Sequence, residues 1–366
     1  MKFYCSSKLL TEALSTVTRA LPQKSTNPVY ENILIQTAED SIYLTCSDER
    51  FTIRTLIEAR IDEHGSMLVP GRLFNDVARF LPEGEVEVLT NASYQTRISL
   101  GGSRTNISGI DPTLFPRLPE LSDGTDLILS QGMLRSMIEK TEFAVDLQNM
   151  REILTGEYIE TDGNTVSIVA LDGFRMAVMN KELASSVKKM KAIIPGKVIS
   201  DLAKLLKDSE EEKAQLTFTG DKLAIVLGDT QLYTSLIGGE YVNYRQIVPK
   251  NFTTRVVVDT DEMKKCIDRA ALIARVGSNN LVRFEISEDT LVMESHSDIA
   301  DTRQEFPITL YGSPLKVNFN VKYISDVLKN MESEKMEISL NTAVTPCVMR
   351  QDGDSGYYHL ILPGRA

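Results

Sequence analysis

The sequence predicts an α+β fold built from three copies of one unit, each with two helices packed on antiparallel β-sheets. One observation is a helical segment that recurs at an interval of 125 residues. A second is a series of short alternating segments, such as Asn32–Thr37, Ser41–Cys46 and Thr52–Ile57, which is typical of antiparallel hairpins. Helices and antiparallel strands combined in one unit define the α+β class.

The repeated helical segment begins in stretches that start at Val69, Ile194 and Phe319. These stretches read VPGRLFNDVARF, IPGKVISDLAKL and FNVKYISDVLKN. Three copies in one register indicate a triplication, whereas one short helix matches another by chance much more readily. The matching residues are Arg72, Lys197 and Lys322; Asp76, Asp201 and Asp326; Val77, Leu202 and Val327; and Arg79, Lys204 and Lys329.

A further helical segment opens each third of the chain. These segments are Lys8–Leu21, Gly132–Ala144 and Glu262–Arg275. Polar, turn-rich residues near Leu121–Asp126 and Pro249–Thr253 separate the thirds. We therefore predict three domains of the same fold, over residues 1–122, 127–250 and 251–366.

The composition of the 366-residue chain is that of a soluble globular protein, with 42% hydrophobic and 25% charged residues. No apolar run approaches the roughly 20 residues of a membrane helix, and the first residues lack a signal peptide's apolar core, so we expect a cytoplasmic protein without membrane contact. The formal net charge of −11 argues against a conventional basic DNA-binding domain. It leaves open a protein that gathers positive charge on one surface.

Scattered cysteines and histidines argue against a disulfide framework or a metal site. Cys5, Cys46, Cys266 and Cys347 form no CxxC pair, and His64, His296 and His359 are far apart in the sequence, so we expect four reduced thiols and no metal ligands. The motifs GxGxxG, GxxxxGK[ST], HExxH and GxSxG are all absent. Asp352 and Asp354 lie in a turn sequence that lacks the spaced ligands of a calcium loop. We expect no catalytic residues and no cofactor.

The repeated helix presents an apolar side and a basic side. Lys197 and Lys204 are two turns apart and therefore nearly in line, whereas Ile199, Leu202 and Leu206 fall on the opposite side. Asp201 is expected to neutralise part of the basic stripe through an i,i+4 pair. One such helix fits an ordinary solvated face, but three copies in register predict a continuous basic surface.

A triplicated fold with one basic face can close into a ring, alone or as a head-to-tail oligomer. If that face points inward, an acidic protein acquires a positively charged hole. Phosphate contacts without base-reading side chains give sequence-independent, salt-sensitive association that permits sliding. The sequence shows no recognition helix rich in arginine, asparagine and glutamine. These observations favour a protein that encircles double-stranded DNA.

The chain resembles the bacterial DNA polymerase III beta subunit family, the processivity clamps, over its whole length. The resemblance implies a homodimeric ring of six similar domains, with twelve helices lining the hole. It also implies tethering of the replicative DNA polymerase, the clamp loader, and repair and translesion proteins. The motifs that carry it are Thr141–Phe143, Arg151, Asp172–Val178, Tyr244–Arg245, Val248–Lys250, Phe319–Val321, Tyr323, Asp326–Leu328 and Leu360–Pro363.

The resemblance further implies a pocket between the second and third domains that takes a short extended peptide, typically glutamine followed by hydrophobic residues. Apolar walls suit leucine and phenylalanine side chains, with Arg175 fixing orientation, although each apolar member equally fits plain core packing. Phe174, where relatives commonly have histidine, and the terminus Gly364-Arg365-Ala366 depart from the family pattern and put the peptide preference in doubt. The implied pocket residues are Leu154, Leu171, Gly173, Arg175, Met176, Val242, Ile247, Tyr323, Val344, Pro346, Leu360, Leu362 and Pro363.

Two more sets of residues follow from the resemblance. For the ring interface, Ala270–Ile273 equally fit the buried end of their own helix. For DNA, the helical argument covers Arg72 and Lys197, and the family adds loop residues. The implied interface residues are Leu272 and Ile273 against the partner subunit's Val77, Leu81, Arg104, Thr105 and Ile107. The implied DNA-facing residues are Lys24, Arg72, Gln148, Arg151, Lys197, Lys204, Lys322 and Lys329.

Two other functions compete with the clamp. An enzyme is disfavoured because every catalytic motif is absent. A monomeric adaptor of the same fold would keep the peptide pocket without encircling DNA, and the oligomeric mass separates it from a dimer of 40.8 kDa subunits.

Overall fold

The computed structural model describes residues 1–118, 124–277, 280–354 and 356–364. The described chain divides into two compact units, Met1–Arg135 with Asp201–Leu236 (unit 1) and Ser136–Ser200 with Ile237–Ala366 (unit 2). The middle third of the chain thus contributes to both units. The predicted boundary between residues 122 and 127 falls partly on 119–123, outside the described residues.

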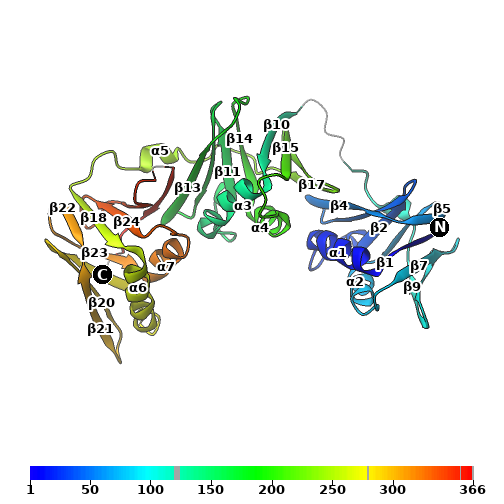
Figure 1. The fold of residues 1–366 in the computed structure, drawn as a ribbon, viewed down its shortest axis with the longest axis horizontal. Helices are drawn as coiled ribbons and strands as arrows, with labels where there is room; N and C mark the ends of the chain where they lie inside the picture. Colours follow the sequence, from blue (N-terminus) through cyan, green and yellow to red (C-terminus); the bar gives the residue numbers. More distant parts are fainter. Residues whose placement is uncertain (119–123, 278–279, 355, 365–366) are drawn as a thin grey trace. The chain divides into compact units, whose positions relative to one another are not determined.

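The same order of elements occurs three times along the chain (Figure 1), which confirms the triplication. Each repeat has a strand, a helix, a group of antiparallel strands, a second helix and three final strands. The first repeat contains β1 (Lys2–Ser6), α1 (Ser7–Val17), β2 (Asn32–Thr37), β3 (Ser41–Ser47), β4 (Phe51–Glu58), β5 (Arg60–Glu63), β6 (Ser66–Pro70), α2 (Gly71–Arg79), β7 (Glu85–Thr90), β8 (Gln95–Leu100) and β9 (Ser103–Ser108).

The second repeat has no strand between its fourth and fifth strands that would correspond to β5, although residues 183–189 there are described. It contains β10 (Thr125–Ser130), α3 (Gln131–Glu139), β11 (Gly156–Thr161), β12 (Thr165–Leu171), β13 (Arg175–Glu182), β14 (Met190–Pro195), α4 (Gly196–Leu205), β15 (Lys213–Thr219), β16 (Lys222–Leu227) and β17 (Thr230–Ser235). The short helix α5 (Tyr244–Ile247) leads to the third repeat.

The third repeat restores the full set of strands. It contains β18 (Thr254–Asp259), α6 (Thr260–Ala274), β19 (Leu281–Ile286), β20 (Thr290–His296), β21 (Asp301–Pro307), β22 (Thr309–Gly312), β23 (Leu315–Asn320), α7 (Val321–Lys329), β24 (Lys335–Leu340), β25 (Cys347–Gln351) and β26 (Tyr357–Ile361). Five 3-10 turns complete the described elements: η1 (Thr18–Ala20), η2 (Pro28–Glu31), η3 (Pro112–Leu114), η4 (Glu142–Ala144) and η5 (Glu152–Leu154).

Strands of neighbouring repeats share sheets. In unit 1, an eight-stranded sheet has the order β10-β15-β16-β17-β4-β3-β2-β6, and a five-stranded sheet the order β5-β1-β7-β8-β9. In unit 2, a nine-stranded sheet has the order β14-β11-β12-β13-β26-β25-β24-β18-β22, and a four-stranded sheet the order β21-β20-β19-β23. Antiparallel pairing of β17 with β4, and of β26 with β13, therefore joins successive repeats through main-chain hydrogen bonds.

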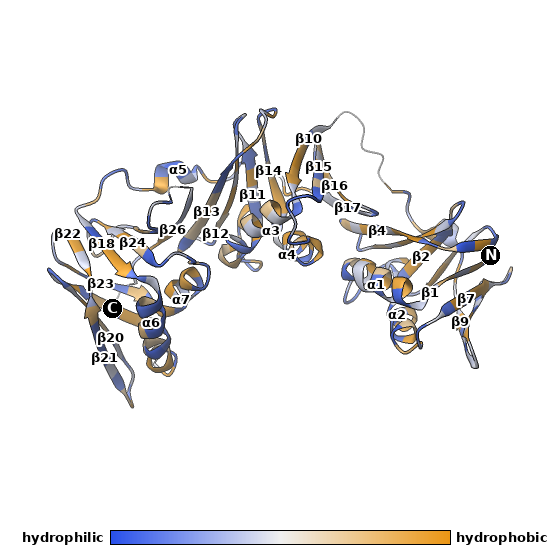
Figure 2. Ribbon diagram, viewed as in Figure 1, coloured by the Kyte–Doolittle hydropathy of each residue, from blue (hydrophilic) through white to orange (hydrophobic). Residues whose placement is uncertain are grey.

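The sequence predicted most local elements correctly. The three alternating segments of the first repeat form β2, β3 and β4, which pair antiparallel as expected. The predicted apolar side is buried, with Ile199 and Leu202 on α4 and Leu206 just after it at most 3% exposed. The helix predicted over Lys8–Leu21 ends earlier, at Val17, and continues as the 3-10 turn η1. Figure 2 shows most hydrophobic residues in strands and helices, whereas the longer loops are mainly polar.

All four cysteines are free and buried. Burial raises the pKa of the Cys5 thiol to about 12, so this group stays protonated at neutral pH. Within the described residues, no cluster of three or more histidine, cysteine, aspartate or glutamate side chains has the arrangement of a metal site. No helix of the described chain is long and apolar enough to cross a membrane.

His359 on β26 is fully buried, and its protonation makes a testable prediction. Its ring packs against Tyr357 and Phe143, with centroid distances of 4.6 and 5.5 Å, and neither ring nitrogen has a hydrogen-bond partner among the described residues. Burial, with the nearby Arg175 charge, lowers the pKa of this imidazole to about 3. Because the unfolded chain binds the proton from about pH 6.5 downward, the free energy of unfolding is expected to fall as pH drops from about 6.5 toward 3.

Replacing His359 with leucine is expected to reduce this acid sensitivity, since the unfolded state then gains no proton at that position. Urea denaturation at pH 7.5 and pH 5 would measure the difference for the wild-type protein and the variant. His64→Leu, which removes an exposed histidine, provides the control for the substitution itself. Equal pH dependence in wild-type and His359→Leu proteins would contradict the prediction.

Candidate functional site

Arg175 begins β13 and holds three parts of unit 2 together. Its guanidinium donates to Asp172 Oδ2 at 2.9 Å, to Asp326 Oδ2 at 2.7 Å and to the Phe143 carbonyl oxygen at 2.7 Å. Arg175 is 7% exposed, and its ring neighbour Tyr323 lies 4.7 Å from the guanidinium carbon. The guanidinium thus links the β12–β13 turn, η4 and α7. Arg175 is expected from the family resemblance to orient a bound peptide, and in the structure the Nε, Nη1 and Nη2 atoms each donate to a group inside the protein.

Seven of the predicted pocket residues form one hydrophobic cluster beside this arginine. Four of them, on η5, β12, β13 and β26, are at most 7% exposed and form the floor of the cluster. The other three are half-buried and pack against that floor from α5, the segment before it and the end of the chain. The floor residues are Leu154, Leu171, Met176 and Leu360, and the half-buried residues are Val242, Ile247 and Leu362. The structure therefore brings together residues from both sides of the β13–β26 junction.

Tyrosines that the sequence analysis missed support the same cluster. The rings of Tyr158 and Tyr241 stack with centroids 4.7 Å apart and an interplanar angle of 3°. Tyr244 meets Tyr158 edge-on and donates its hydroxyl to Glu160 Oε1 at 2.6 Å. Burial raises the pKa of Tyr158 to about 12, which keeps its hydroxyl neutral. Tyr244 belongs to the family motif Tyr244–Arg245, but nothing in the sequence indicated that Tyr241 and Tyr244 would pack on Tyr158 of β11.

The exposed rim of the cluster is also apolar. Phe174 is 60% exposed, and its ring stacks on that of Tyr323 at 6.3 Å. Val344 is 78% exposed, whereas Pro346 and Pro363 are half-buried. The Leu362 N–H donates to the Phe174 carbonyl oxygen at 2.8 Å, which extends the β13–β26 ladder into the rim.

The rim also includes Gly173, which is exposed and has a φ of +97°. That backbone conformation favours glycine at the tip of the β12–β13 turn. We call the thirteen predicted residues together the apolar site. Of the divergent terminus Gly364-Arg365-Ala366, the last two residues lie outside the described chain.

All eight residues predicted to face DNA are exposed. Arg72 on α2 donates to the Pro22 carbonyl oxygen at 3.0 Å and so lies against the loop that carries Lys24. Gln148 and Arg151 lie in the loop before η5. The remaining four lie on α4 and α7, one at the start and one near the end of each helix: Lys197, Lys204, Lys322 and Lys329.

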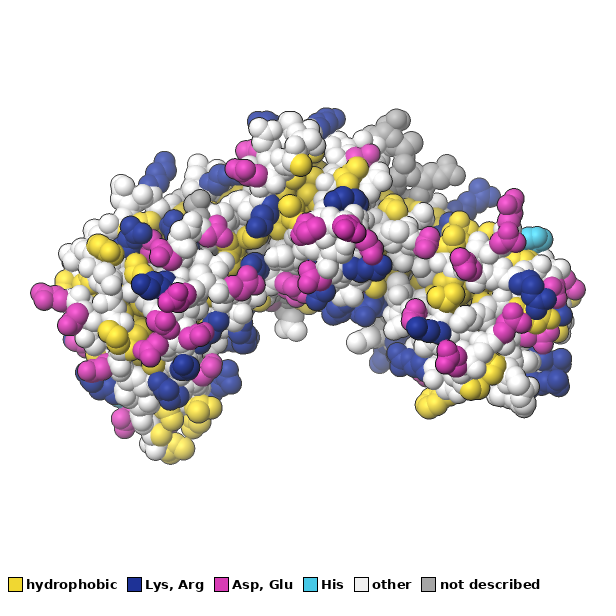
Figure 3. All heavy atoms as spheres, in the orientation of Figure 1, with side chains coloured by type: hydrophobic (Ala, Val, Ile, Leu, Met, Phe, Trp, Pro, Cys, Tyr) yellow, Lys and Arg dark blue, Asp and Glu magenta, His cyan; other side chains and the backbone are white. Residues whose placement is uncertain are grey.

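Aspartates reduce the charge of these helices through pairs at i,i+3 spacing. Asp201 pairs with Lys204 at 3.6 Å, an i,i+3 contact, and with Arg19 of η1 at 3.8 Å. Asp326 likewise pairs with Lys329 at 3.1 Å. The second basic residue of the stripe is therefore partly neutralised on both helices. Figure 3 shows basic and acidic side chains intermixed over the face in view.

The predicted interface residues lie on or next to α2 and β9 of the first repeat and α6 of the third repeat. Leu272, on α6, is 66% exposed, and Ile273 beside it is half-buried. Val77 and Leu81, on and just after α2, are half-buried, and β9 carries Arg104, Thr105 and Ile107. Ile107 is 3% exposed, so its side chain packs inside unit 1. Phe80, the residue directly after α2, is 90% exposed.

Comparison with known proteins agrees with this architecture along the whole chain. Models of the DNA polymerase III beta subunit match residues 1–119 (N-terminal domain), 128–243 (central domain) and 245–365 (C-terminal domain). The beta sliding clamp of Staphylococcus aureus is 31% identical over 375 aligned residues, which cover 100% of this chain and 99% of that protein.

Solved structures give the same result. The DNA polymerase sliding clamp of Bacillus subtilis superposes with a TM-score of 0.97 at 27% identity, covering 100% of this chain and 99% of that one. A putative DNA polymerase III beta subunit of Eubacterium rectale superposes with a TM-score of 0.96 at 27% identity, covering 100% of both chains. The chain therefore belongs to the DNA polymerase III beta subunit family of sliding clamps.

Proposed function

We propose that the protein is a DNA sliding clamp that encircles duplex DNA as a head-to-tail homodimer and tethers the replicative polymerase. It acts by topology, without catalysing a reaction. The repeated strand junction is the observation that carries this proposal. A tethered polymerase meets its template at a high local concentration, which replaces repeated encounters from solution.

The junctions within the chain follow one rule. In both, the strand that follows the second hairpin turn of one repeat pairs with the last strand of the next repeat: β4 with β17, and β13 with β26. By the same rule β21 should pair with β9, but these strands lie at the open edges of the four-stranded and five-stranded sheets. A second copy of the chain satisfies both edges, since β21 of each subunit meets β9 of its partner. Two such junctions close a ring of six repeats.

The register of this third junction can be transferred from the first. In the β4–β17 pair, Ile53 lies opposite Leu232. Counting from the equivalent hairpin turns places Thr302 of β21 opposite Thr105 of the partner's β9. Thr105 was among the residues that the sequence predicted for this interface.

Cysteines placed at Thr105 and Thr302 are expected to form disulfides between subunits on oxidation, because directly opposed residues of adjacent strands have Cβ atoms about 4.5–5.5 Å apart. Non-reducing gel electrophoresis should show a covalent dimer for the double variant and monomers for either single variant. The four native thiols are buried and should not interfere. Monomers from the oxidised double variant would show that the transferred register is wrong.

The basic helices account for DNA contact without sequence reading. Paired lysines on α4 and α7, and arginines on α2, lie two turns apart and are exposed. Their contacts to phosphates would be individually weak and screened by salt, which suits movement along the duplex. The aspartate partners of Lys204 and Lys329 weaken these contacts further and favour sliding over a fixed grip.

The apolar site is proposed to recruit partners. The polymerase, the clamp loader, and repair and translesion proteins would each insert a short extended peptide. Its hydrophobic side chains would cover the half-buried residues of the cluster and the exposed rim. Phe174 and Val344 are both exposed and therefore available to a peptide. The double variant Phe174→Ala/Val344→Asp is expected to bind a peptide of glutamine, leucine, serine, leucine and phenylalanine about tenfold more weakly, or weaker still.

Fluorescence anisotropy with the labelled peptide would measure this loss of affinity. The dimer mass and thermal stability of the variant should stay unchanged, because neither side chain belongs to the core. Tyr311→Ala removes an aromatic side chain of similar exposure, 57%, from β22 and provides the matched control. Equal affinity of the Phe174/Val344 variant and the wild-type protein would place the peptide elsewhere.

The clamp itself can be tested by loading the protein onto nicked circular plasmid with a cognate loader and ATP, and then cutting the DNA. At a salt concentration that screens phosphate contacts, release on cutting is expected, because a closed ring slides off a free end. A known clamp run in parallel controls for the loader. Retention after cutting, or a failure to capture circular DNA while the control succeeds, would overturn the proposal.

A further inference from the structure

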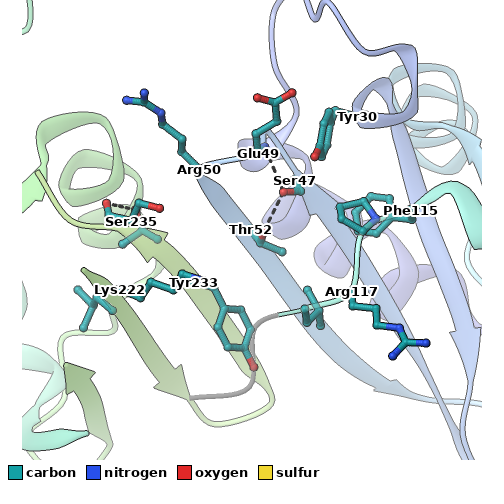
Figure 4. A pocket seen from close by; sticks show the side chains of 14 residues that line it. Tyr30, Ser47, Glu49, Arg50, Thr52, Phe115, Arg117, Lys222, Tyr233 and Ser235 are labelled. Atoms are coloured by element: carbon teal, nitrogen blue, oxygen red, sulfur yellow. Dashed lines mark hydrogen bonds between the residues drawn. The ribbon is translucent and has the colours of Figure 1, made fainter. Parts of the chain in front are cut away.

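A cavity of about 250 Å³ lies in unit 1 where β4 meets β17. Its lining comes from the β3–β4 turn, the segment Phe115–Leu118 and the β16–β17 hairpin. Figure 4 shows Tyr30, Phe115 and Arg117 on one side of it, and Lys222 and Tyr233 on the other. We call this the polar cavity.

The turn beside the polar cavity repeats the turn beside the apolar site. In the β3–β4 turn, Asp48 Oδ1 accepts the N–H groups of the second and third residues that follow it, at 3.2 and 2.8 Å. In the β12–β13 turn, Asp172 Oδ1 accepts the corresponding groups at 2.9 and 3.0 Å. The residue after each aspartate has a positive φ, +80° at Glu49 and +97° at Gly173. The two turns therefore have the same geometry.

The strand registers agree as well. Thr52 lies opposite Tyr233 in the β4–β17 pair, as Met176 lies opposite Leu360 in the β13–β26 pair. Thr52 and Met176 each lie the same number of residues after the aspartate of their turn. The polar cavity is thus the counterpart, at the first junction between repeats, of the apolar site at the second.

The chemistry of the two places differs. Hydroxyl groups replace hydrocarbon in the cavity, and Ser47 and Thr52 share a hydrogen bond of 2.7 Å between their hydroxyl oxygens. A side chain that enters the cavity would therefore meet hydrogen-bonding groups instead of an apolar floor. In each of the following pairs, the residue of the apolar site is named first and its counterpart in the polar cavity second: Leu154 and Tyr30, Leu171 and Ser47, Met176 and Thr52, Leu360 and Tyr233, Leu362 and Ser235, and Pro346 and Lys222.

Positive charge dominates the cavity's rim although the protein carries a net charge of −11. Arg50, Arg117 and Lys222 line it, against a single carboxylate at Glu49. Arg117 and Lys222 are exposed and have no ion-pair partner among the residues that the structure describes. Two cations beside hydroxyl donors match the hydrogen-bonding needs of a carboxylate.

We propose that the polar cavity is a second peptide site, which takes an aspartate or glutamate side chain from an extended, acidic segment of a partner protein. The inference rests on the proposed role of the apolar site, because it treats the cavity as that site's counterpart. A volume of about 250 Å³ holds one or two side chains, so affinity would come from a carboxylate and its immediate neighbours. A partner that carries both an apolar and an acidic segment would bind the clamp at two places and gain affinity through linkage.

Fluorescence anisotropy can test the site with a fluorescein-labelled hexapeptide of alternating glutamate and leucine, whose glutamates share one face when extended. Its glutamine counterpart is expected to bind the dimer at least tenfold more weakly. The double variant Arg117→Glu/Lys222→Glu should also lose at least tenfold in affinity for the glutamate peptide. Lys188→Glu/Lys189→Glu makes the same change in charge on an exposed loop and should stay within twofold of the wild type.

Two further readings separate this inference from the proposed function. The glutamine-led peptide of the apolar site and the dimer mass should be unaffected by Arg117→Glu/Lys222→Glu. If both remain normal while the glutamate peptide binds wild type and double variant equally, the second site is wrong and the clamp stands. Loss of glutamate-peptide binding in Phe174→Ala would place that peptide at the apolar site and overturn the inference. Displacement of the glutamate peptide by a short DNA duplex would show that Arg117 and Lys222 bind DNA, which would also overturn the inference.

Discussion

Replacing Arg175 with alanine is expected to lower the free energy of unfolding of unit 2 by about 3–5 kcal/mol, because it leaves buried charges without compensation. Asp172 and Asp326, with side chains 10% and 15% exposed, each lose an ion pair with the guanidinium. The Phe143 carbonyl oxygen loses a donor at 2.7 Å. Chemical denaturation followed by circular dichroism would measure the loss.

An exposed ion pair in the same unit provides the control for Arg175→Ala. Lys316 and Glu285 lie 2.7 Å apart, with side chains 56% and 38% exposed, so Lys316→Ala should cost no more than about 1 kcal/mol. Adding Asp326→Asn to Arg175→Ala should recover part of the loss, because it removes one of the two unpaired carboxylates. Similar effects of Arg175→Ala and Lys316→Ala would show that Arg175 does not hold the unit together.

Leu272→Asp is expected to convert the dimer to 40.8 kDa monomers at micromolar concentration. Within unit 1, η1 of the first repeat reaches α4 of the second through Arg19 and Asp201, 3.8 Å apart. The same relation between subunits brings α6 toward the partner's α2, where Phe80 is exposed. Each ring contains this contact twice, so two leucine side chains worth about 1.5–3 kcal/mol each are lost and two carboxylates are desolvated.

These losses correspond to a dissociation constant raised by about a thousandfold or more. Sedimentation equilibrium would measure it, and the monomer should still bind the glutamine-led peptide. Ile128 on β10 is exposed to a similar extent, 58% against 66% for Leu272, and takes no part in the proposed interface. Ile128→Asp should therefore remain a dimer. A dimer of unchanged affinity in Leu272→Asp would remove α6 from the interface.

Local periodicity explains what the sequence could predict. Hairpins, helices and the buried face of α4 follow from patterns that repeat every two or every 3.6 residues, and the triplication follows from three such patterns in register. The seven clustered members of the apolar site were found through family resemblance. Composition does not distinguish Met176 in the floor from Leu362 at the rim, because burial depends on which strands become neighbours.

Long-range pairing explains what the sequence could not predict. Arg175 and Asp326 are 151 residues apart, and they meet because β13 pairs with β26. The alternation along β9 would place Ile107 inside, but the resemblance assigned it to the interface without reference to its own packing. The polar cavity could not be predicted from the sequence, because its hydroxyl residues come from three separate segments. They correspond to residues of the apolar site only through strand register.

The shared sheets also set the order in which the protein can be completed during synthesis. β4 obtains its partner β17 through contacts such as Thr55 to Thr230, 175 residues later in the chain. At about 5–20 residues per second, the edge of β4 stays open for roughly 10–35 seconds after it leaves the ribosome. The edge of β13 then stays open until β26 has been made. An open strand edge can pair with other chains. The strand pairs that connect successive repeats in the finished protein are therefore the places where the nascent chain is most exposed to mispairing.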